Sequence, residues 1–221
     1  FMAVAATFLF MAHPIHTEAV ANIKGRDEIL TLLGSLAALY YSIRGYQDRK
    51  PSMSIGAAVL FFLALLAKEN AITFVAIVPL AYYFFTKADF TTIFRRSLPF
   101  LGVAIAFLFV RAAVLGWDFG APSGELMNNP FLKLENNRWI PMDFMEKMAI
   151  IMYSLGKYIV LLFFPHPLTH DYYPRAIGMV TWGDWQVILA FLAHVALLAY
   201  AVWGLLKKNW ISFGILGYLL T

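Results

Sequence analysis

Residues 13–28, with the sequence HPIHTEAVANIKGRDE, separate two strongly apolar segments and carry two histidines and five charged side chains. Each charge placed at the middle of a bilayer costs about 3 kcal/mol on membrane-insertion scales. Burying all five would cost about 15 kcal/mol, which roughly cancels what a neighbouring apolar helix gains by insertion. The segment is therefore predicted to lie at a membrane surface or to line a wet cavity.

The composition of the whole chain supports a membrane setting. Hydrophobic residues make up 61% of the 221 residues and charged residues only 14%, whereas soluble domains are about half apolar and a quarter charged. Cysteine is absent, which excludes disulfides and thiolate metal sites. The net charge is +4 without a long basic run, so we expect no nucleic-acid partner. These features predict an integral membrane protein embedded in a lipid bilayer.

Apolar segments that could form membrane helices, or parts of them, recur along the chain. They cover residues 1–12, 29–43, 53–67, 71–86, 98–116, 148–164, 187–206 and 210–221. We expect an all-α, polytopic transmembrane helical bundle in which residues 1–221 form part of one domain. Because both Phe1 and Thr221 lie inside apolar runs, we expect this chain to be truncated at both ends.

The distribution of basic residues predicts the orientation of this bundle. Three short loops share eight basic residues and only two acidic ones, Asp48 and Asp89: Arg44, Arg49 and Lys50; Lys87, Arg95 and Arg96; Lys207 and Lys208. Lysine and arginine in short loops favour the cytoplasmic side. The remaining polar segments are then expected on the outer side: 13–28, 68–70, 117–147 and 166–186.

The apolar segment 148–164 conflicts with this orientation if it spans the membrane completely. Strict alternation would then place 166–186 inside and the pair Lys207 and Lys208 outside, against the charge rule. A polar stripe also follows the segment at roughly helical spacing, made of Asp143, Lys147, Ser154 and Lys157. We therefore interpret this helix as lying in the outer interface, or as entering the membrane and returning.

Within residues 13–28 the sequence predicts a short helix. Pro14 suits the first helical turn, Gly25 suits a C-terminal cap, and Asp27 can cap a following helix that begins at Glu28. On the short helix, Glu18 would share a face with Asn22, and Arg26 would follow just beyond.

Two interpretations of this segment stay open. Charged connectors between membrane helices are common, but a connector needs only solubility, and the clustering of His13, His16 and Glu18 therefore favours a functional role. Histidine and glutamate can bind zinc, yet H-x-x-H-x-E is not a strong metal-binding spacing and Pro14 restricts its geometry. We prefer proton handling or hydrogen bonding to a polar substrate over a metal site.

Residues 68–70 form a second polar island in a long apolar stretch. They could be the charged tip of a helical hairpin. Alternatively, Lys68 could contact the phosphate of a lipid, with Glu69 orienting that phosphate or a hydroxyl. Arg111 is expected either to extend to the outer surface or to point inward as a second cationic contact.

The long polar segment 117–147 contains glycines and prolines, with a turn predicted at residues 128–131. Its polar and aromatic stretch at 135–139 suits contacts with a sugar or peptide, and it suits an interface anchor equally well. A further island at 164–175 contains three prolines that exclude a helix. Its His170 and Asp171 could form an acid–base pair and Tyr172 could stack on a sugar, or the island could be an aromatic interfacial loop.

Three of these motifs carry a resemblance to a known family. His13-Pro14 and His16-Thr17-Glu18-Ala19-Val20, followed by Gly25-Arg26, resemble a segment of the transmembrane and tetratricopeptide-repeat O-mannosyltransferase family, within the GT-C glycosyltransferase superfamily. Lys68-Glu69 matches a Lys-Glu step of this family, and Leu168-Thr169-His170-Asp171-Tyr172 resembles its later outer loop. The match runs in order over most of the chain.

The resemblance implies a GT-C-like membrane enzyme whose site faces the lumen or periplasm. It implies a polyprenyl-phosphate sugar donor, an acceptor hydroxyl on a protein or glycan, and repeats that follow the membrane part. We expect no cofactor. The acidic residue expected to act as catalytic base would lie in the first outer loop, before Phe1. The repeats would lie after Thr221, so neither feature is expected in this chain.

The sites follow from this resemblance and from the chemistry. Sugar transfer from a lipid phosphate needs a base for the acceptor hydroxyl and cations for the leaving phosphate. The expected phosphate-binding residues are Arg26, Lys68, Arg138 and Arg175. The expected supporting residues are His13, His16, Glu18, His170 and Asp171, and the expected contacts with acceptor or sugar are Glu69, Trp139 and Tyr172.

Two alternative functions stay open. A transporter of lipid-linked sugars would more often bury ionisable groups at the bilayer midplane, whereas most charge here maps to one side. An accessory membrane subunit could retain the fold without catalysis. The short outer loops and the lack of cysteine favour a bacterial inner membrane, with the site facing the periplasm.

Overall fold

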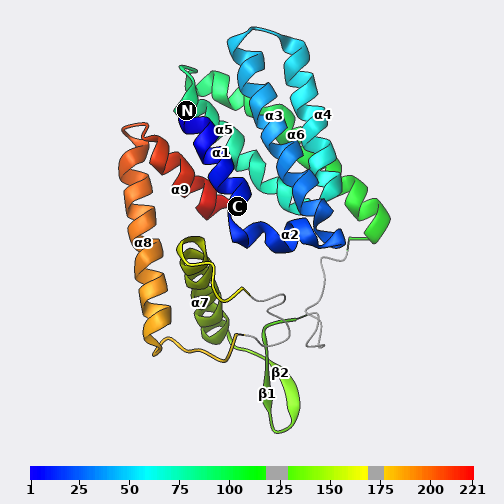
Figure 1. The fold of residues 1–221 in the computed structure, drawn as a ribbon. Helices are drawn as coiled ribbons and strands as arrows, with labels where there is room; N and C mark the ends of the chain where they lie inside the picture. Colours follow the sequence, from blue (N-terminus) through cyan, green and yellow to red (C-terminus); the bar gives the residue numbers. More distant parts are fainter. Residues whose placement is uncertain (118–128, 169–176) are drawn as a thin grey trace. The chain divides into compact units, whose positions relative to one another are not determined.

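The computed structural model describes residues 1–117, 129–168 and 177–221 (Figure 1). The chain divides into two compact units. Unit 1 comprises residues 1–18 and 118–196, and unit 2 comprises residues 19–117 and 197–221.

Unit 2 is built mainly from helices that lie close to the predicted apolar segments. They are α3 (Arg26–Gln47), α4 (Pro51–Ala67), α5 (Phe74–Phe85), α6 (Phe90–Leu115) and α9 (Trp210–Leu220). A short 3₁₀ turn, η3 (Glu69–Thr73), precedes α5. Pro51 begins α4 at the first helical position, where the missing N–H of proline costs no hydrogen bond. The predicted helical character of the fold is thus confirmed, while the polytopic transmembrane bundle stays a prediction.

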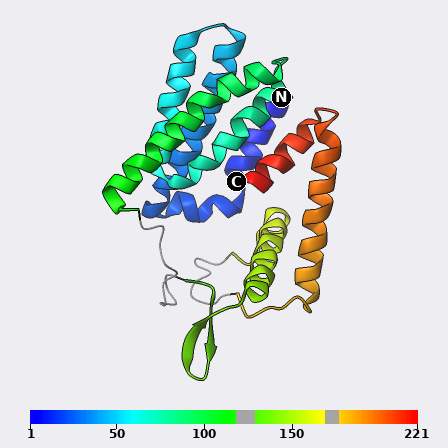
Figure 2. The ribbon, with the colours of Figure 1, turned by 180° about the vertical axis from the view of Figure 1, so that it is seen from behind.

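Small residues bring α3 and α4 together as an antiparallel pair, which both views show side by side (Figure 2). Ser35 and Ala38 of α3, and Ala57 and Ala64 of α4, are buried. A Cβ atom added to Gly34 would lie 2.9 Å from the Cβ of Ala64. Small side chains let the helix backbones approach closely, which is how membrane helices commonly gain packing energy.

The core of unit 2 extends from this pair to α5 and α6. The ring centroids of Phe61 and Phe100 are 5.4 Å apart. Tyr82 of α5 is buried, and its hydroxyl donates to the backbone carbonyl of Ser42 at 2.8 Å. A buried hydroxyl needs such a partner, so this bond fixes α5 against α3.

The basic loops gather at one end of unit 2. The Arg96 guanidinium of α6 lies 5.8 Å from the ring centroid of Tyr46 in α3. The Lys208 ammonium lies 4.7 Å from the ring centroid of Tyr83, near the end of α5. The polar residues Lys68 and Glu69 lie at the other end of α4. The loops therefore group as the charge rule predicts, while the side of the membrane that each end faces stays a prediction.

Two of the described helices are long and apolar enough to cross a membrane, namely α6 and α8 (Trp185–Leu205). Shorter apolar helices occupy Met2–Ala12 (α1), Pro51–Ala67, Glu69–Phe85 and Trp210–Leu220. Helix α7 (Phe144–Phe163), which carries Glu146, Lys147 and Lys157, is not among these helices. The interpretation of α7 as an interfacial or re-entrant helix stays a prediction.

Unit 1 contains a feature that the all-α prediction missed. Strands β1 (Leu132–Glu135) and β2 (Arg138–Pro141) form an antiparallel hairpin in which Glu135 is paired with Arg138. The turn residues Asn136 and Asn137 have φ values of 50° and 60°. Positive φ at both positions is what a two-residue hairpin turn of type I′ requires, and asparagine tolerates this backbone better than most residues.

Helix α7 begins directly after this hairpin and is well capped. The Asp143 side chain accepts from the Glu146 N–H at 2.8 Å, and the Glu146 side chain accepts from the Asp143 N–H at 2.9 Å. This capping box satisfies two backbone donors at the helix start. Further along α7, a Cβ added to Gly156 would lie 2.6 Å from the Cβ of Ala190 in α8, so glycine permits this close helix contact.

Candidate functional site

The polar segment folds as a series of short turns. His13 precedes η1 (Pro14–His16), α2 (Thr17–Ala21) and η2 (Ile23–Gly25), and α3 then begins at Arg26. Pro14 starts its turn as predicted. Gly25 is not a left-handed cap, because its φ is −73°. A Cβ there would lie 2.2 Å from the carbonyl oxygen of Ala19, so the glycine is required by close backbone approach.

His13 uses both ring nitrogens on backbone groups within unit 1. Nδ1 accepts from the N–H of Ile15 at 3.2 Å, and Nε2 lies 2.9 Å from the carbonyl oxygen of Leu162 in α7. Since Nδ1 accepts, the proton belongs on Nε2, which donates to Leu162 and leaves the ring neutral. His13 therefore acts structurally here.

His16 and Glu18 are differently placed. The His16 ring centroid lies 4.3 Å from that of Phe10, and Glu18 is exposed on α2. Among the described residues, neither side chain makes a hydrogen bond or ion pair. Both polar groups thus keep their hydrogen-bonding capacity for a ligand.

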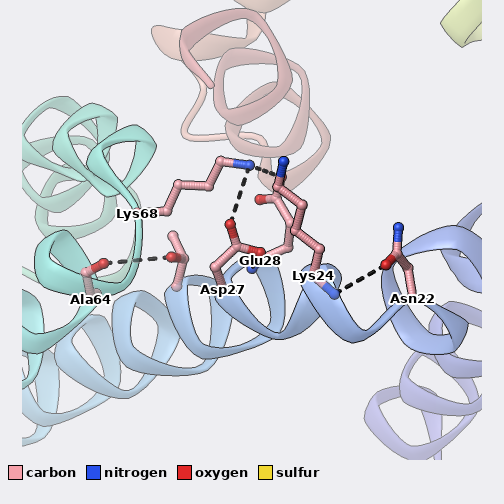
Figure 3. Close-up of polar contacts among 7 residues, drawn as sticks. Asn22, Lys24, Asp27, Glu28, Ala64 and Lys68 are labelled. Carbon is pink, nitrogen blue, oxygen red and sulfur yellow. Dashed lines mark hydrogen bonds and ion pairs between the residues drawn. The ribbon is translucent and has the colours of Figure 1, made fainter. Parts of the chain in front are cut away.

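Lys68 is the centre of a charged group in unit 2 (Figure 3). It caps the end of α4, and its ammonium donates to the Glu28 carboxylate and lies 3.9 Å from an Asp27 oxygen. We call Asp27, Glu28 and Lys68 the Lys68 cluster. The hydrogen bond to Glu28, together with both negative charges, raises the pKa of Lys68 above its ordinary value. The cluster joins the start of α3 to the α4–α5 turn and keeps the lysine charged.

A second ion pair holds the same turn from the other side. Arg111, near the end of α6, donates through Nε to Glu69 at 2.9 Å. The residue was expected to reach the surface or to point inward, and the structure pairs it with the turn. Sequence reasoning missed the roles of Asp27, Glu28 and Arg111, because their partners are about 40 residues away along the chain.

Two cations near the start of α3 have no acidic partner among the described residues. Lys24 and Arg26 are exposed, and within the described part of the chain their side chains form no ion pair. Figure 3 shows the Lys24 side chain on the same side of the chain as Asp27 and Glu28. The positive charge that is free to meet a phosphate therefore comes from Arg26 and Lys24, while that of Lys68 is shared with carboxylates.

The remaining predicted residues belong to unit 1. Arg138 and Trp139 lie on β2, where they pair with Glu135 and Leu134 of β1. Lys133 of β1 donates to Glu146 at 2.7 Å, which raises the pKa of Lys133 and lowers that of Glu146.

Four predicted site residues lie outside the described residues: His170, Asp171, Tyr172 and Arg175. In the residues that the structure describes, no three His, Asp or Glu side chains gather in a way that could hold a metal ion.

Comparison with known proteins identifies the family. Residues 1–117 match the family described as dolichyl-phosphate-mannose-protein mannosyltransferase. Since this match covers more than half of the chain, the protein belongs to this family, and the resemblance to the transmembrane and tetratricopeptide-repeat O-mannosyltransferases is confirmed. Together with the apolar helices, this makes the chain part of a membrane protein.

Several relatives named as protein O-mannosyl-transferases support this family assignment. The chain is 30% identical over 211 residues to mouse protein O-mannosyl-transferase TMTC2, covering 88% of this chain and 25% of the relative. It is 31% identical over 180 residues to Caenorhabditis elegans protein O-mannosyl-transferase F38B6.6, covering 81% and 24%. The chain thus spans about a quarter of the length of these relatives. No solved structure matches it.

Proposed function

We propose that this chain is part of a membrane glycosyltransferase that moves a sugar from a polyprenyl-phosphate donor to a hydroxyl group of a protein. The Lys68 cluster supports this proposal, together with Arg26, which precedes Asp27 on α3, in a chain whose relatives are named protein O-mannosyl-transferases. We place the site at this end of unit 2, on the extracytoplasmic side, which in a bacterium is the periplasmic face.

The reaction breaks the bond between the sugar C1 and the phosphate oxygen, whose electron pair leaves with the phosphate. The acceptor oxygen bonds to C1 and gives its proton to a base. Cations are needed where negative charge develops on the leaving phosphate. Arg26 suits this role because its planar guanidinium can donate two parallel hydrogen bonds to phosphate. Lys68 has three N–H donors, and only the one donated to Glu28 is used in a hydrogen bond, so donors remain for the phosphate.

The polar groups of residues 13–18 suit the acceptor side. His16 and Glu18 have free hydrogen-bonding capacity and could orient a hydroxyl. His13 is a positioning residue, since its bond to Leu162 holds the segment against α7. No described residue is assigned as the base.

The test is a transfer assay with the full-length protein, using labelled polyprenyl-phosphate mannose and an acceptor peptide. Arg26→Gln should lower turnover by about 100-fold, the loss expected when one donor to a developing charge is removed. The matched control, Lys207→Gln, removes a cation at the other end of unit 2 and should leave turnover within about twofold. Normal turnover of Arg26→Gln would refute the assignment, and a native protein inactive with every donor would favour an accessory subunit.

A further inference from the structure

The end of unit 2 that carries the basic loops holds a pocket to which no function is assigned. Its volume is ≈ 570 Å³, and it lies between the α3–α4 turn and the first turns of α6. The residues that line it are Tyr46, Gln47, Arg49, Pro51, Thr92 and Arg96. Two guanidinium groups, a phenol, an amide and an aliphatic hydroxyl thus share one hollow.

Arg96 is held in place within this pocket. Its Nη1 donates to the hydroxyl of Ser54 at 3.0 Å, and its guanidinium lies over the ring of Tyr46. Neither contact neutralises the charge. A guanidinium has five N–H donors, so further donors are available to a ligand. Arg96 therefore offers a positioned positive charge.

Arg49 contributes the second charge from an unusual backbone. Its φ is 53°, in the left-handed region that costs an ordinary residue about 1–2 kcal/mol. The turn holds it there through the Lys50 N–H, which donates to the Gly45 carbonyl at 3.0 Å. Glycine or asparagine would suit this backbone better, so the arginine is placed at the rim of the pocket at a conformational cost.

The neighbouring carboxylates do not cancel these charges. Asp48 lies 3.6 Å from Arg44. Asp89 precedes the first residue of α6, and a hydrogen bond from Thr92 lowers the pKa of its carboxyl. Each of the two loops carries three basic residues and one acidic residue, a net charge of +2. In the described ranges of the chain, neither Arg49 nor Arg96 forms an ion pair.

An exposed apolar stripe leads away from the pocket along α4. It starts at Pro51 and continues at four-residue spacing through Ile55, Val59 and Leu63, whose side chains are 68%, 53% and 55% exposed. Residues four apart on a helix share a face, so the stripe is continuous. A cationic pocket at the head of an apolar stripe matches a phosphate group joined to acyl chains.

We propose that this pocket binds the phosphate of an anionic phospholipid from the leaflet that borders the basic loops, with the acyl chains along the α4 stripe. Arginine pairs bidentately with phosphate, and basic pockets at the ends of membrane helices suit anionic headgroups. The site lies at the opposite end of α4 from the Lys68 cluster. It is therefore separate from the proposed sugar transfer.

The experiment measures lipid binding to the full-length protein in neutral detergent by native mass spectrometry. Dioleoyl phosphatidylglycerol should bind at least tenfold more tightly than dioleoyl phosphatidylcholine. The double variant Arg49→Gln, Arg96→Gln should lose about 30-fold in affinity for phosphatidylglycerol, from about fivefold for each basic residue near a membrane surface. The double variant Lys207→Gln, Lys208→Gln removes equal charge outside the pocket and should lose less than about threefold.

Three outcomes would overturn the proposal. These are equal binding of the two lipids, equal losses in the two double variants, and binding of inorganic phosphate or glycerol phosphate as tight as that of the lipid. The last result would indicate a site for soluble phosphate. If the glutamine variant does not fold, Arg49→Lys with Arg96→Lys keeps the charge but not the bidentate geometry. It should then lose about fivefold, and unchanged binding would refute the site.

Discussion

The two ends of unit 2 hold their cations in different ways. At the Lys68 end, carboxylates pair with Lys68 and Arg111 and bind the α4–α5 turn to α3 and α6. At the other end, aromatic rings hold the cations, with the Lys207 ammonium 3.8 Å from the ring centroid of Trp203 and Arg96 over Tyr46. Ion pairs fix geometry and cancel charge, whereas rings position a cation and leave its charge available. The first arrangement fixes the α4–α5 turn and leaves Lys24 and Arg26 as cations without an ion pair in the described part of the chain. The second leaves positive charge available at the basic end.

The largest expected effect is the loss of sugar transfer when Lys68 is replaced. Lys68→Gln removes a donor to the phosphate and leaves Asp27 and Glu28 unpaired. We expect sugar transfer by the full-length protein to fall by about 100-fold or more. Lys208→Gln, at the ring-held end, should change transfer by less than about twofold. Similar losses in both variants would show that the two ends do not differ in function.

The next largest effect should be a loss of stability caused by a substitution at Gly25, just before α3. Gly25→Ala forces a Cβ against the Ala19 carbonyl, and we expect the free energy of unfolding to fall by about 2 kcal/mol. Gly102→Ala in α6 is the matched control, because its Cβ would meet no atom within 4 Å. Alanine favours helix over glycine by about 1 kcal/mol, so this variant should be slightly stabilised. Thermal unfolding in detergent compares them, and a Gly25→Ala protein as stable as the native one would contradict the close approach.

The local stability around Lys68 and around Glu146 should change with pH in opposite directions. The pKa of Lys68 is raised above its ordinary value of 10.5, so its stabilising contribution is present below that pH and is lost as pH rises through the raised pKa. The pKa of Glu146 is lowered from 4.5, so its contribution is present above that pH and is lost as pH falls through the lowered pKa. Amide exchange near each residue measures this, and Glu146→Gln should remove the acid-side change.

The smallest effect concerns the rings at the basic end. Lys207→Gln removes the cation over Trp203, an exposed contact worth about 0.5–1 kcal/mol. Trp203→Leu should cause a loss of similar size, and the double variant should lose no more than either single one. A double-mutant cycle on thermal unfolding gives this coupling directly, and additive losses would show that the contact contributes nothing.

The helices could largely be predicted from the sequence, because unbroken apolar runs and flanking charges are local signals. The start of η1 at Pro14 followed in the same way. The β-hairpin was missed, since its strands have only four residues and the Asn136-Asn137 pair was the main signal. The ion pairs were missed for another reason. Asp27 and Glu28 meet Lys68 only when α3 and α4 form an antiparallel pair, which no local pattern encodes.

The central claim is that the donor phosphate binds at the ion-paired end of unit 2. A photoreactive polyprenyl-phosphate mannose analogue, irradiated with the full-length protein and mapped by mass spectrometry, tests this most directly. We expect cross-links on residues 19–28 and 68–70 that excess unlabelled donor removes. Competable cross-links confined to residues 44–50 and 87–96, at the ring-held end, would contradict it.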